Sequence, residues 1–259
     1  MVNANAVISK TAQIGADVSI AAGVIIEDAV IIGEGCRIEA YVIIHRGTVL
    51  GDRVHIGAFS VIGAQPTMLD EEATPCGGLH IGAHTHIDPN CVIARASKFD
   101  ENTLIGAACE IMAGVHIDTD CVIGDSVRIS NHSKLAGAVL LADQASIGSF
   151  VCLHASIRVG HYAQVSDHAV ITADIPPYTQ ATQRDRVDGL NEAALLAADF
   201  SKLDLNDLKR CYQAVYCGGT GELAEKAKQA LREHEFATTR VGARFLSFFE
   251  GGSIGFICT

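Results

Sequence analysis

The sequence contains no tryptophan, and aromatic residues make up only 5% of a chain in which 49% of residues are hydrophobic. A conventional core in a chain of 259 residues uses more large rings, because aromatic side chains bury the most apolar surface each. Many small aliphatic residues and 25 glycines instead predict a thin, repetitive core.

Basic residues are also scarce, with 19 Lys and Arg against 30 Asp and Glu and a net charge of −11. This balance argues against nucleic acid and against an anionic membrane surface as partners. No apolar run approaches the roughly 18–20 residues of a membrane span, so we expect no transmembrane segment. The N-terminal residues lack the basic and apolar regions of a signal peptide, and we expect a cytoplasmic protein.

What the sequence has instead is a repeat, because aliphatic residues recur at every sixth position. The first series breaks at 64–79, and a second series then runs without interruption to Ile171. The first series is Ile8, Ile14, Ile20, Ile26, Ile32, Ile38, Ile44, Leu50, Ile56 and Ile62. The second begins Ile81, Ile87, Ile93, Phe99, Ile105, Ile111, Ile117, Ile123 and Ile129, and ends Val159, Val165, Ile171.

A period of six is neither the helical period nor the plain strand period. It indicates one short strand and one tight corner per repeat, so that three repeats close a triangular coil of about 18 residues. The aliphatic residue then points inward, and the glycine that often follows it is expected to let the backbone turn. The predicted fold class is all-β repeat plus α, a parallel β-helix of hexapeptide repeats.

The repeat also explains the cysteines, of which there are nine and no CxxC pair. Cys36, Cys91, Cys109 and Cys121 share one place in the repeat. We therefore interpret them as small buried residues in a reducing compartment and not as disulfides or metal ligands. Neither a metal nor another cofactor is predicted.

The predicted organisation is a β-helix over residues 1–178 and a helical domain over residues 179–259. The break at 64–79 is rich in Pro, Gly and acidic residues and is read as a loop inserted into the β-helix. Pro176 and Pro177 cannot continue a strand ladder. A helical pattern follows from about Asn191, with further helices near 221–234 and around Phe245.

These features together resemble one family, the UDP-N-acetylglucosamine O-acyltransferases of lipid A biosynthesis. The resemblance covers essentially the whole chain. It is carried by residues 117–124, 134–137, 174–178, 189–191 and 208–216. It implies a left-handed β-helix and a homotrimer with active sites in grooves between the prisms. It also implies acyl transfer from acyl carrier protein to a sugar-nucleotide hydroxyl. In the family a histidine is the general base, and the backbone N–H at the position of Gly137 holds the oxyanion.

The central motif of that family reads His-Ile-Ala-His-Asp, and its second His is the base. Here the motif is His116-Ile117-Asp118-Thr119-Asp120, so that the first His and the final acid are kept and Thr119 replaces the base. A threonine hydroxyl cannot accept a proton at neutral pH. A supporting His is replaced by Ala138, whereas a later family His is retained as His154.

The resemblance also assigns substrate contacts. The family's Ile-His-Arg-Gly-Thr motif falls by register on 93–97 and keeps Arg95. The same string stands intact at 44–48, which is nearly three coils too early, so His45 is interpreted as a surface residue. In the loop, Met68 occupies the place of a sugar-binding Asp, with Asp70 close by.

At the C-terminal end Asn191 is retained, but Ala197 replaces a basic residue. Asp167 stands where a glycine in the family admits long acyl chains to the end of the groove. A carboxylate there either faces water or shortens the groove, because burying it unpaired is costly.

Three interpretations remain open. The first is acyl transfer from acyl carrier protein to a sugar-nucleotide-like acceptor at an altered or degraded site, with His116 as a substitute base. The second is a catalytically inactive paralogue, a pseudoenzyme, that acts as a binding or structural trimer. The third is a zinc enzyme, suggested by His80, His84 and His86, although their spacing fits surface histidines better.

Overall fold

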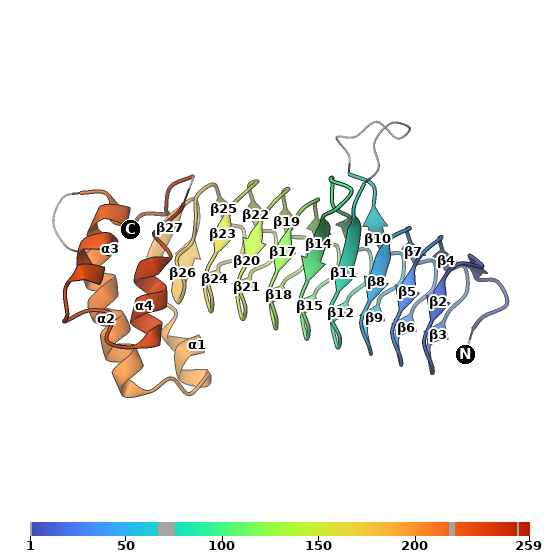
Figure 1. Ribbon diagram of the computed structural model, residues 1–259, viewed down its shortest axis with the longest axis horizontal. Helices are drawn as coiled ribbons and strands as arrows, with labels where there is room; N and C mark the ends of the chain where they lie inside the picture. The colour runs from blue at the N-terminus through green and yellow to red at the C-terminus, as the bar shows by residue number, and fades with distance from the viewer. Residues whose placement is uncertain (1, 67–75, 218–220, 253) are drawn as a thin grey trace.

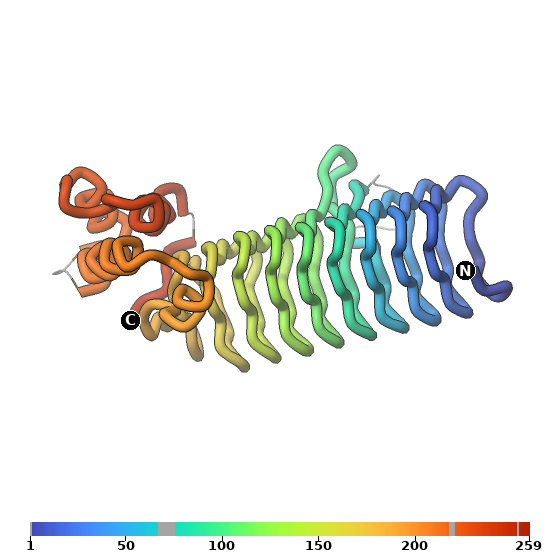
Figure 2. The backbone as a smooth tube through the Cα atoms, turned by 90° about the horizontal axis from the view of Figure 1, so that it is seen from below, coloured from blue at the N-terminus to red at the C-terminus, as the bar shows by residue number. Residues whose placement is uncertain are grey.

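The computed structural model describes residues 2–66, 76–217, 221–252 and 254–259. It is a long left-handed parallel β-helix with a small group of helices at its C-terminal end (Figure 1). Successive coils stack along the axis of the prism, and the N-terminus lies at the end opposite the helices (Figure 2).

Three parallel sheets form the faces of the prism, and the chain visits them in turn. Sheet 1 has nine strands: β1 (Val7–Ile8), β4 (Ile25–Ile26), β7 (Ile43–Ile44), β10 (Val61–Ala64), β13 (Val92–Ala94), β16 (His116–Ile117), β19 (Lys134–Leu135), β22 (Cys152–Leu153) and β25 (Val170–Ile171). Sheet 2 has eight: β2 (Gln13–Ile14), β5 (Ile31–Ile32), β8 (Thr48–Leu50), β11 (Gly78–Ile81), β14 (Asn102–Ile105), β17 (Val122–Ile123), β20 (Leu140–Leu141) and β23 (Arg158–Val159).

Sheet 3 has ten strands, and its last two extend the prism toward the helices. They are β3 (Ser19–Ile20), β6 (Arg37–Ile38), β9 (His55–Ile56), β12 (His86–Ile87), β15 (Glu110–Ile111), β18 (Arg128–Ile129), β21 (Ser146–Ile147), β24 (Gln164–Val165), β26 (Thr179–Thr182) and β27 (Arg186–Leu190).

The register confirms the predicted coil. Val7 pairs with Ile25 and Ile8 with Ile26, one coil further along the chain. The second residue of a typical strand points into the prism and is buried, whereas the first faces outward. Stacked aliphatic side chains therefore fill the interior as one continuous core. Burial of these side chains is the main favourable contribution to the stability of the prism.

Two loops leave the prism at the same corner, between sheet 1 and sheet 2, in consecutive coils. We call this edge the loop corner. The first loop joins β10 to β11 and was predicted from the break at 64–79. The second joins β13 to β14 and was not predicted. The end of β10, the start of β11 and the second loop lie on the same side of the prism in Figure 1.

The expectation that Phe99 belongs to the inward series is wrong, because Phe99 lies in the second loop and its side chain is 68% exposed. Sheet 1 pairs Val92 with His116 across this loop, a longer step than the ordinary coil. Thr103 is the residue that turns inward at the start of the next strand, and it is fully buried.

Corner glycines have a different role from the predicted one. The residue that adopts a left-handed backbone is the third after the inward aliphatic, as at Arg53, whose φ is 54°. The glycine directly after the aliphatic instead lies against the next coil. A Cβ on Gly33 would stand 2.6 Å from the carbonyl carbon of Gly51. Close stacking of coils, and not a special φ, requires glycine there.

The four cysteines of the repeat are buried as predicted, and each thiol lies against a backbone carbonyl of the next coil. Cys36 Sγ is 3.1 Å from Gly51 O, and Cys121 Sγ is 3.3 Å from Ala136 O. Burial raises the pKa of the Cys91 thiol to about 11 and that of Cys121 to about 12. These thiols therefore stay protonated at neutral pH and are unreactive packing residues.

Strand pairing continues beyond Tyr178, the last residue predicted for the β-helix. Strand β26 pairs in parallel with β24, and β27 then turns back antiparallel to β26. The described residues then form four helices where three were predicted, because the stretch from Asn191 is divided in two: α1 (Glu192–Ala197), α2 (Lys202–Tyr216), α3 (Leu223–Arg232) and α4 (Arg240–Ser247). They share a second core with the end of the prism, built around Leu208, Phe245 and Tyr178.

A buried ion pair fastens the helical end to the prism. Arg158 of β23 approaches Asp174, with 2.7 Å between Nε and Oδ2, and the Asp174 side chain is 1% exposed. The same guanidinium donates to the carbonyl of Phe248 and lies over its ring. Asp174 also accepts the backbone N–H of Arg158 on its other oxygen, so both carboxylate oxygens are bound and the buried charge is compensated.

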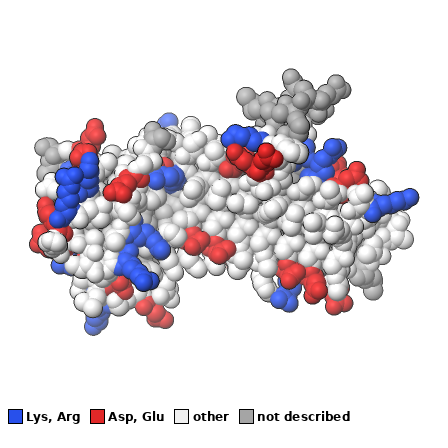
Figure 3. All heavy atoms as spheres, in the orientation of Figure 1, with Lys and Arg blue, Asp and Glu red and all other residues white. Residues whose placement is uncertain are grey.

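In the view of Figure 3, charged side chains gather near the loops, over the helices and along the lower edge of the N-terminal half of the prism. Among the described residues, none of the helices is both long and apolar enough to span a bilayer.

Candidate functional site

The loop corner brings together most of the residues that the sequence singles out. Thr119 and Asp120 lie on it between β16 and β17, Gly137 lies one coil further, and His154 one coil beyond that. Arg95 lies on the coil before Thr119, at the start of the second loop. Residues far apart in sequence therefore form one column, because every third corner of a β-helix falls on the same edge.

Thr119 is engaged in the fold itself. Its hydroxyl Oγ1 donates to the backbone carbonyl of Arg95 across a distance of 2.9 Å. Its backbone N–H is bound by the carboxylate of Asp118 at 2.8 Å. The side chain thus links two neighbouring coils. It holds no group that can take a proton from a substrate hydroxyl near neutral pH.

Asp120 is likewise occupied. One carboxylate oxygen accepts the backbone N–H of Ser97 at 2.8 Å, and the other accepts the Ser97 hydroxyl at 2.7 Å. Ser97 belongs to the second loop, so Asp120 anchors that loop to the prism. The acid predicted to orient a base has a structural role here.

Gly137 keeps the feature expected of an oxyanion donor. Within the described residues its backbone N–H makes no hydrogen bond. At the equivalent corner place the N–H of Ala107 is capped by Asp125. The residue that would cap Gly137 is Ala155, which has no oxygen to offer. A Cβ on Gly137 would meet Thr119 O at 3.5 Å, an ordinary van der Waals contact, so packing against the neighbouring coil does not require glycine there.

The two remaining histidines occupy different settings. His154 is exposed on the loop corner. His116 is half-buried on the outer side of sheet 1, where it pairs with Val92 on one side and Lys134 on the other. Its imidazole makes no hydrogen bond to any other described side chain or backbone group. His116 is the histidine nearest to Thr119 in sequence, three residues before it.

Arg95 is the most unusual charge near the site. Its side chain is buried, with 8% of the residue exposed. One guanidinium nitrogen, Nη2, donates to Gln65 at 2.8 Å, but the buried Nε has no partner. No ion pair within the described part of the chain neutralises this charge.

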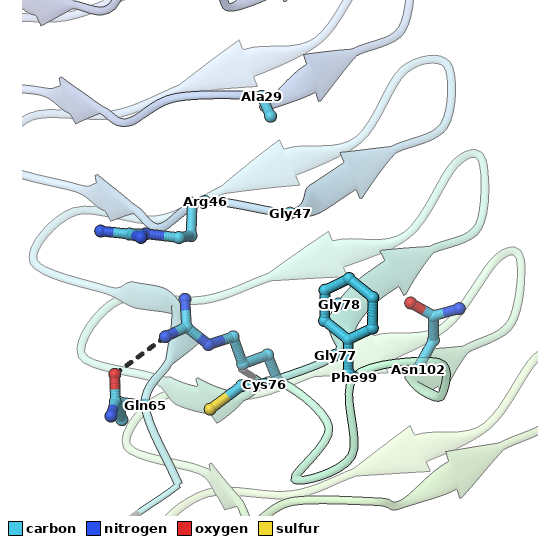
Figure 4. Close-up of a pocket in the computed structure, with 10 residues that line it drawn as sticks. Ala29, Arg46, Gly47, Gln65, Cys76, Gly77, Gly78, Phe99 and Asn102 are labelled. Atoms are coloured by element: carbon cyan, nitrogen blue, oxygen red, sulfur yellow. Dashed lines mark hydrogen bonds between the residues drawn. The ribbon is translucent and has the colours of Figure 1, made fainter. Parts of the chain in front are cut away.

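Arg95 lies in a cavity of about 530 Å³ at the base of the two loops, which we call the arginine cavity. Gln65 and Asn102 line it from the two loop bases, Gly47 and Gly78 lie between them, and Arg46 comes from an earlier coil. Figure 4 shows these residues, with the dashed line marking the bond that Gln65 accepts from Arg95.

The Ile-His-Arg-Gly-Thr string at 44–48 therefore lies closer to Arg95 than the count of nearly three coils suggested. Sheet 1 pairs β7 with β10 and β10 with β13, so Arg46 and Arg95 lie on the same corner with one coil between their own. The first loop lengthens the chain between them without separating them in space. His45 itself lies against Glu27, with 3.1 Å between Nδ1 and Oε1.

Three predicted contacts lie elsewhere. Met68 and Asp70 fall outside the residues that the structure describes. Asn191 is buried, and its side chain caps α1 and donates to the carbonyl of Tyr162 at 3.0 Å. Its contact with a ligand stays a prediction.

Asp167 is exposed and lies at the corner between sheet 3 and sheet 1, away from the loop corner. Its carboxylate accepts the backbone N–H of Ser149 at 2.7 Å. Asp125 and Asp143 cap neighbouring coils in the same way. Asp167 therefore has a structural role, and the chain-length role stays a prediction.

The histidines considered for zinc are separated. His80, His84 and His86 are all exposed. His86 instead faces His55, with 3.0 Å between the two Nδ1 atoms, while Glu39 and Asp88 hold the outer nitrogens. Over the described ranges no group of three or more His, Cys, Asp or Glu is arranged to hold a metal ion.

Three protein-family models match parts of the chain. The bacterial transferase hexapeptide family matches residues 29–64, the GMPPB C-terminal domain matches 79–183, and the second domain of Udp N-acetylglucosamine O-acyltransferase matches 174–257. No curated protein sequence matches the chain.

Solved structures match over the full length. UDP-N-acetylglucosamine acyltransferase from Campylobacter jejuni is 25% identical with a TM-score of 0.91, covering 100% of both chains. LpxA from Bacteroides fragilis is 28% identical with a TM-score of 0.92, covering 99% of this chain and 100% of its own. The Francisella novicida enzyme is 25% identical with a TM-score of 0.91, covering 100% and 94%. Over its whole length the chain is similar to LpxA UDP-N-acetylglucosamine acyltransferases.

For an LpxA-like chain, the structure adds two residues that the sequence reasoning missed. Ser97 occupies both oxygens of Asp120, and Gln65 holds Arg95. No motif marks either residue. The sequence does contain one related signal, because the similar strings at 44–48 and 93–97 each place an arginine at the third position, Arg46 and Arg95.

Proposed function

We propose that this chain is an LpxA-like protein whose active site is altered, so that acyl transfer to UDP-N-acetylglucosamine is greatly slowed. The observation that carries the proposal is the hydrogen bond from the Thr119 hydroxyl to the carbonyl of Arg95. A residue at the family's base position thereby stabilises the fold and offers no proton acceptor. Any remaining transfer would run from acyl carrier protein to a sugar-nucleotide-like acceptor.

The chemistry shows what is lost. A substrate hydroxyl attacks the thioester carbonyl, its proton passes to a base, and a thiol leaves. Gly137 retains the N–H that could stabilise the oxyanion, and such donors contribute a large share of catalysis. The base contributes about 10²–10⁴-fold, and neither Thr119 nor the occupied Asp120 replaces it.

The trimer inferred from the family supports this site. Within one chain Asp167 and Thr119 lie on different corners, so they can face one groove only across a boundary between subunits. A groove of that kind places the end of the acyl chain on one prism and the reacting centre on its neighbour. The homotrimer and its groove are part of the proposal.

A second candidate function is an inactive paralogue that binds ligands as a trimer. It is favoured by the way Thr119 and Asp120 both hold neighbouring segments of the fold. His116 argues against an inactive protein, because its imidazole is half-buried near the site and makes no hydrogen bond to the described residues. If His116 acts as a substitute base, the chain remains a slow enzyme.

Two substitutions separate these candidates. Thr119→Val removes the hydroxyl and keeps the shape, and we expect it to leave residual transfer unchanged. His116→Gln should abolish residual transfer if His116 is the base. The assay follows acyl transfer from acyl carrier protein to UDP-N-acetylglucosamine, with melting temperature as the folding control. A large loss of transfer in a folded Thr119→Val protein would contradict the proposed role of Thr119.

A further inference from the structure

Two histidines on the outer side of sheet 3 face one another at a place that the acyl-transfer proposal does not use. His55 is the first residue of β9 and His86 is the first residue of β12, and these strands are paired neighbours in the sheet (Figure 1). Their Nδ1 atoms lie 3.0 Å apart. His86 is exposed and His55 is half-buried, so a small ion can reach the space between the two rings from solvent.

The outer nitrogen of each ring is held by a carboxylate. Nε2 of His55 lies 3.0 Å from Glu39 Oε1, and Nε2 of His86 lies 3.0 Å from Asp88 Oδ1. An ionised carboxylate offers only acceptors, so each Nε2 carries the proton of its ring and donates it. In a neutral imidazole the other nitrogen, here Nδ1, then holds a lone pair.

The two Nδ1 lone pairs are therefore directed at each other. Two lone pairs at this separation repel unless a cation lies between them. A shared proton is one such cation, and a metal ion that accepts both lone pairs is the other. Two nitrogens bound to one transition-metal ion at about 2.0–2.1 Å lie about 2.9 Å apart at a right angle and about 3.3–3.4 Å apart at the tetrahedral angle. The observed 3.0 Å falls between these values.

The two carboxylates stand where the outer shell of a metal site needs them. A histidine that binds a metal usually donates its other N–H to a carboxylate, which fixes the tautomer and the orientation of the ring. Glu39 is itself held, because its second oxygen accepts the backbone N–H of Ala58 at 3.3 Å and Arg37 lies 3.5 Å from the first. The fold thus orients the imidazoles before an ion binds.

The site offers only two ligand side chains, so water completes the coordination of the ion. It differs in this respect from a set of three or more ligands, of which the described ranges contain none. The surrounding charge suits a cation. Glu110 follows His86 on the next strand of sheet 3, and the chain as a whole carries a net charge of −11.

We infer that His55 and His86 bind one divalent transition-metal ion through their Nδ1 atoms, with Glu39 and Asp88 as acceptors behind them. The ion belongs to the class that prefers imidazole, such as nickel(II), copper(II) or zinc(II). It cross-links β9 to β12, the two ends of the coil from which the first loop leaves. Because only the folded chain brings the two rings together, binding stabilises that coil.

The test is calorimetric titration of the full chain, prepared without a histidine tag, with nickel(II) chloride. Nickel(II) prefers imidazole and does not oxidise the exposed thiols of Cys217 and Cys258. We expect saturable binding of one ion per chain and a melting temperature that rises as the metal is added. Magnesium(II) prefers oxygen ligands and should produce neither effect.

Three variants locate the ion. His86→Gln removes one ligand and should abolish both saturable binding and the rise in melting temperature. Asp88→Ala keeps both ligands and removes only the acceptor behind His86, so nickel affinity should fall by about 10- to 100-fold. His80→Gln changes another exposed histidine and should have no effect.

Melting of each variant without metal shows that it is folded. The inference is overturned if nickel(II) does not bind saturably below about 0.1 mM, which would mean that the two rings share only a proton. It is equally overturned if His86→Gln binds nickel(II) like the unmodified protein, or if His80→Gln weakens binding as much as His86→Gln does.

Discussion

Restoring the family's base by Thr119→His should not restore ordinary turnover. The substitution supplies an imidazole one coil before Gly137, whose N–H makes no hydrogen bond within the described residues. A catalytic base, however, also needs a group that fixes its orientation. Asp120 would be that group, and both of its oxygens are already bound by Ser97.

The size of the effect follows from these contacts. A general base contributes about 10²–10⁴-fold. Without an orienting carboxylate, we expect Thr119→His to recover only about 10-fold. Ser97→Ala removes the hydroxyl from one oxygen of Asp120 and leaves that oxygen free. Coupling between such neighbours is about 1–2 kcal/mol, so Thr119→His with Ser97→Ala should gain about 5- to 30-fold more.

The assay is a double-mutant cycle in transfer from acyl carrier protein to UDP-N-acetylglucosamine. Ser97→Ala alone should not raise transfer, because no base is present to be oriented. Circular dichroism of the Ser97→Ala variants should confirm that the prism stays folded when the second loop loses this contact with Asp120. The reasoning fails if Thr119→His alone reaches ordinary family turnover, or if the two changes are simply additive.

Four further predictions concern assembly, groove, stability and reactivity. Sedimentation should show a trimer at micromolar concentration, and a stable monomer would contradict the groove between subunits. Asp167→Gly should lower the free energy of unfolding by about 1 kcal/mol, because the backbone N–H of Ser149 loses its acceptor. The same substitution should strengthen the binding of long acyl-pantetheines. If long saturated chains bind most strongly to the unmodified protein, the chain-length role is wrong. Asp207 is buried, which raises its pKa, but hydrogen bonds from Thr239 outweigh this and hold the pKa below its ordinary value. The stability it contributes is therefore present above the unfolded pKa and lost as pH falls through the folded one, and Asp207→Asn should flatten the acid side of the stability curve. Cys121, with a pKa of about 12, should resist alkylation at pH 8 until the protein unfolds, whereas exposed Cys217 reacts.

Much of the fold follows from the sequence because a β-helix repeats one local solution. The period of six places Ile26, Ile117 and their equivalents inside the prism, and it explains why Cys36 and Cys121 are buried. The first loop interrupts the period and is visible for that reason. Helix α2 follows from its apolar face, and a capping box at Ser201 precedes its first residue, Lys202.

The second loop was hidden by its length. It adds six residues between Ile93 and Ile105, which is one full repeat, so the aliphatic series continues in phase. Phe99 then resembles a core residue although its ring faces solvent. A periodic pattern cannot reveal an insertion of one period.

The site was predicted less completely than the fold. Register alone placed Arg95 and Thr119, but it could not show that one bonds to the other or that Arg95 is buried without an ion partner among the described residues. Those facts depend on how neighbouring coils meet. They also depend on the loop length that brings Arg46 to the same cavity.

The most direct test of the central claim is the turnover of the unmodified protein. Purified chain is assayed beside the Campylobacter jejuni acyltransferase with the same acyl carrier protein donors and UDP-N-acetylglucosamine. Because the Thr119 hydroxyl is bound to the carbonyl of Arg95 and cannot act as a base, turnover should be lower by about 10²–10⁴-fold. Equal turnover would show that another group performs the proton transfer at full efficiency and would contradict the account.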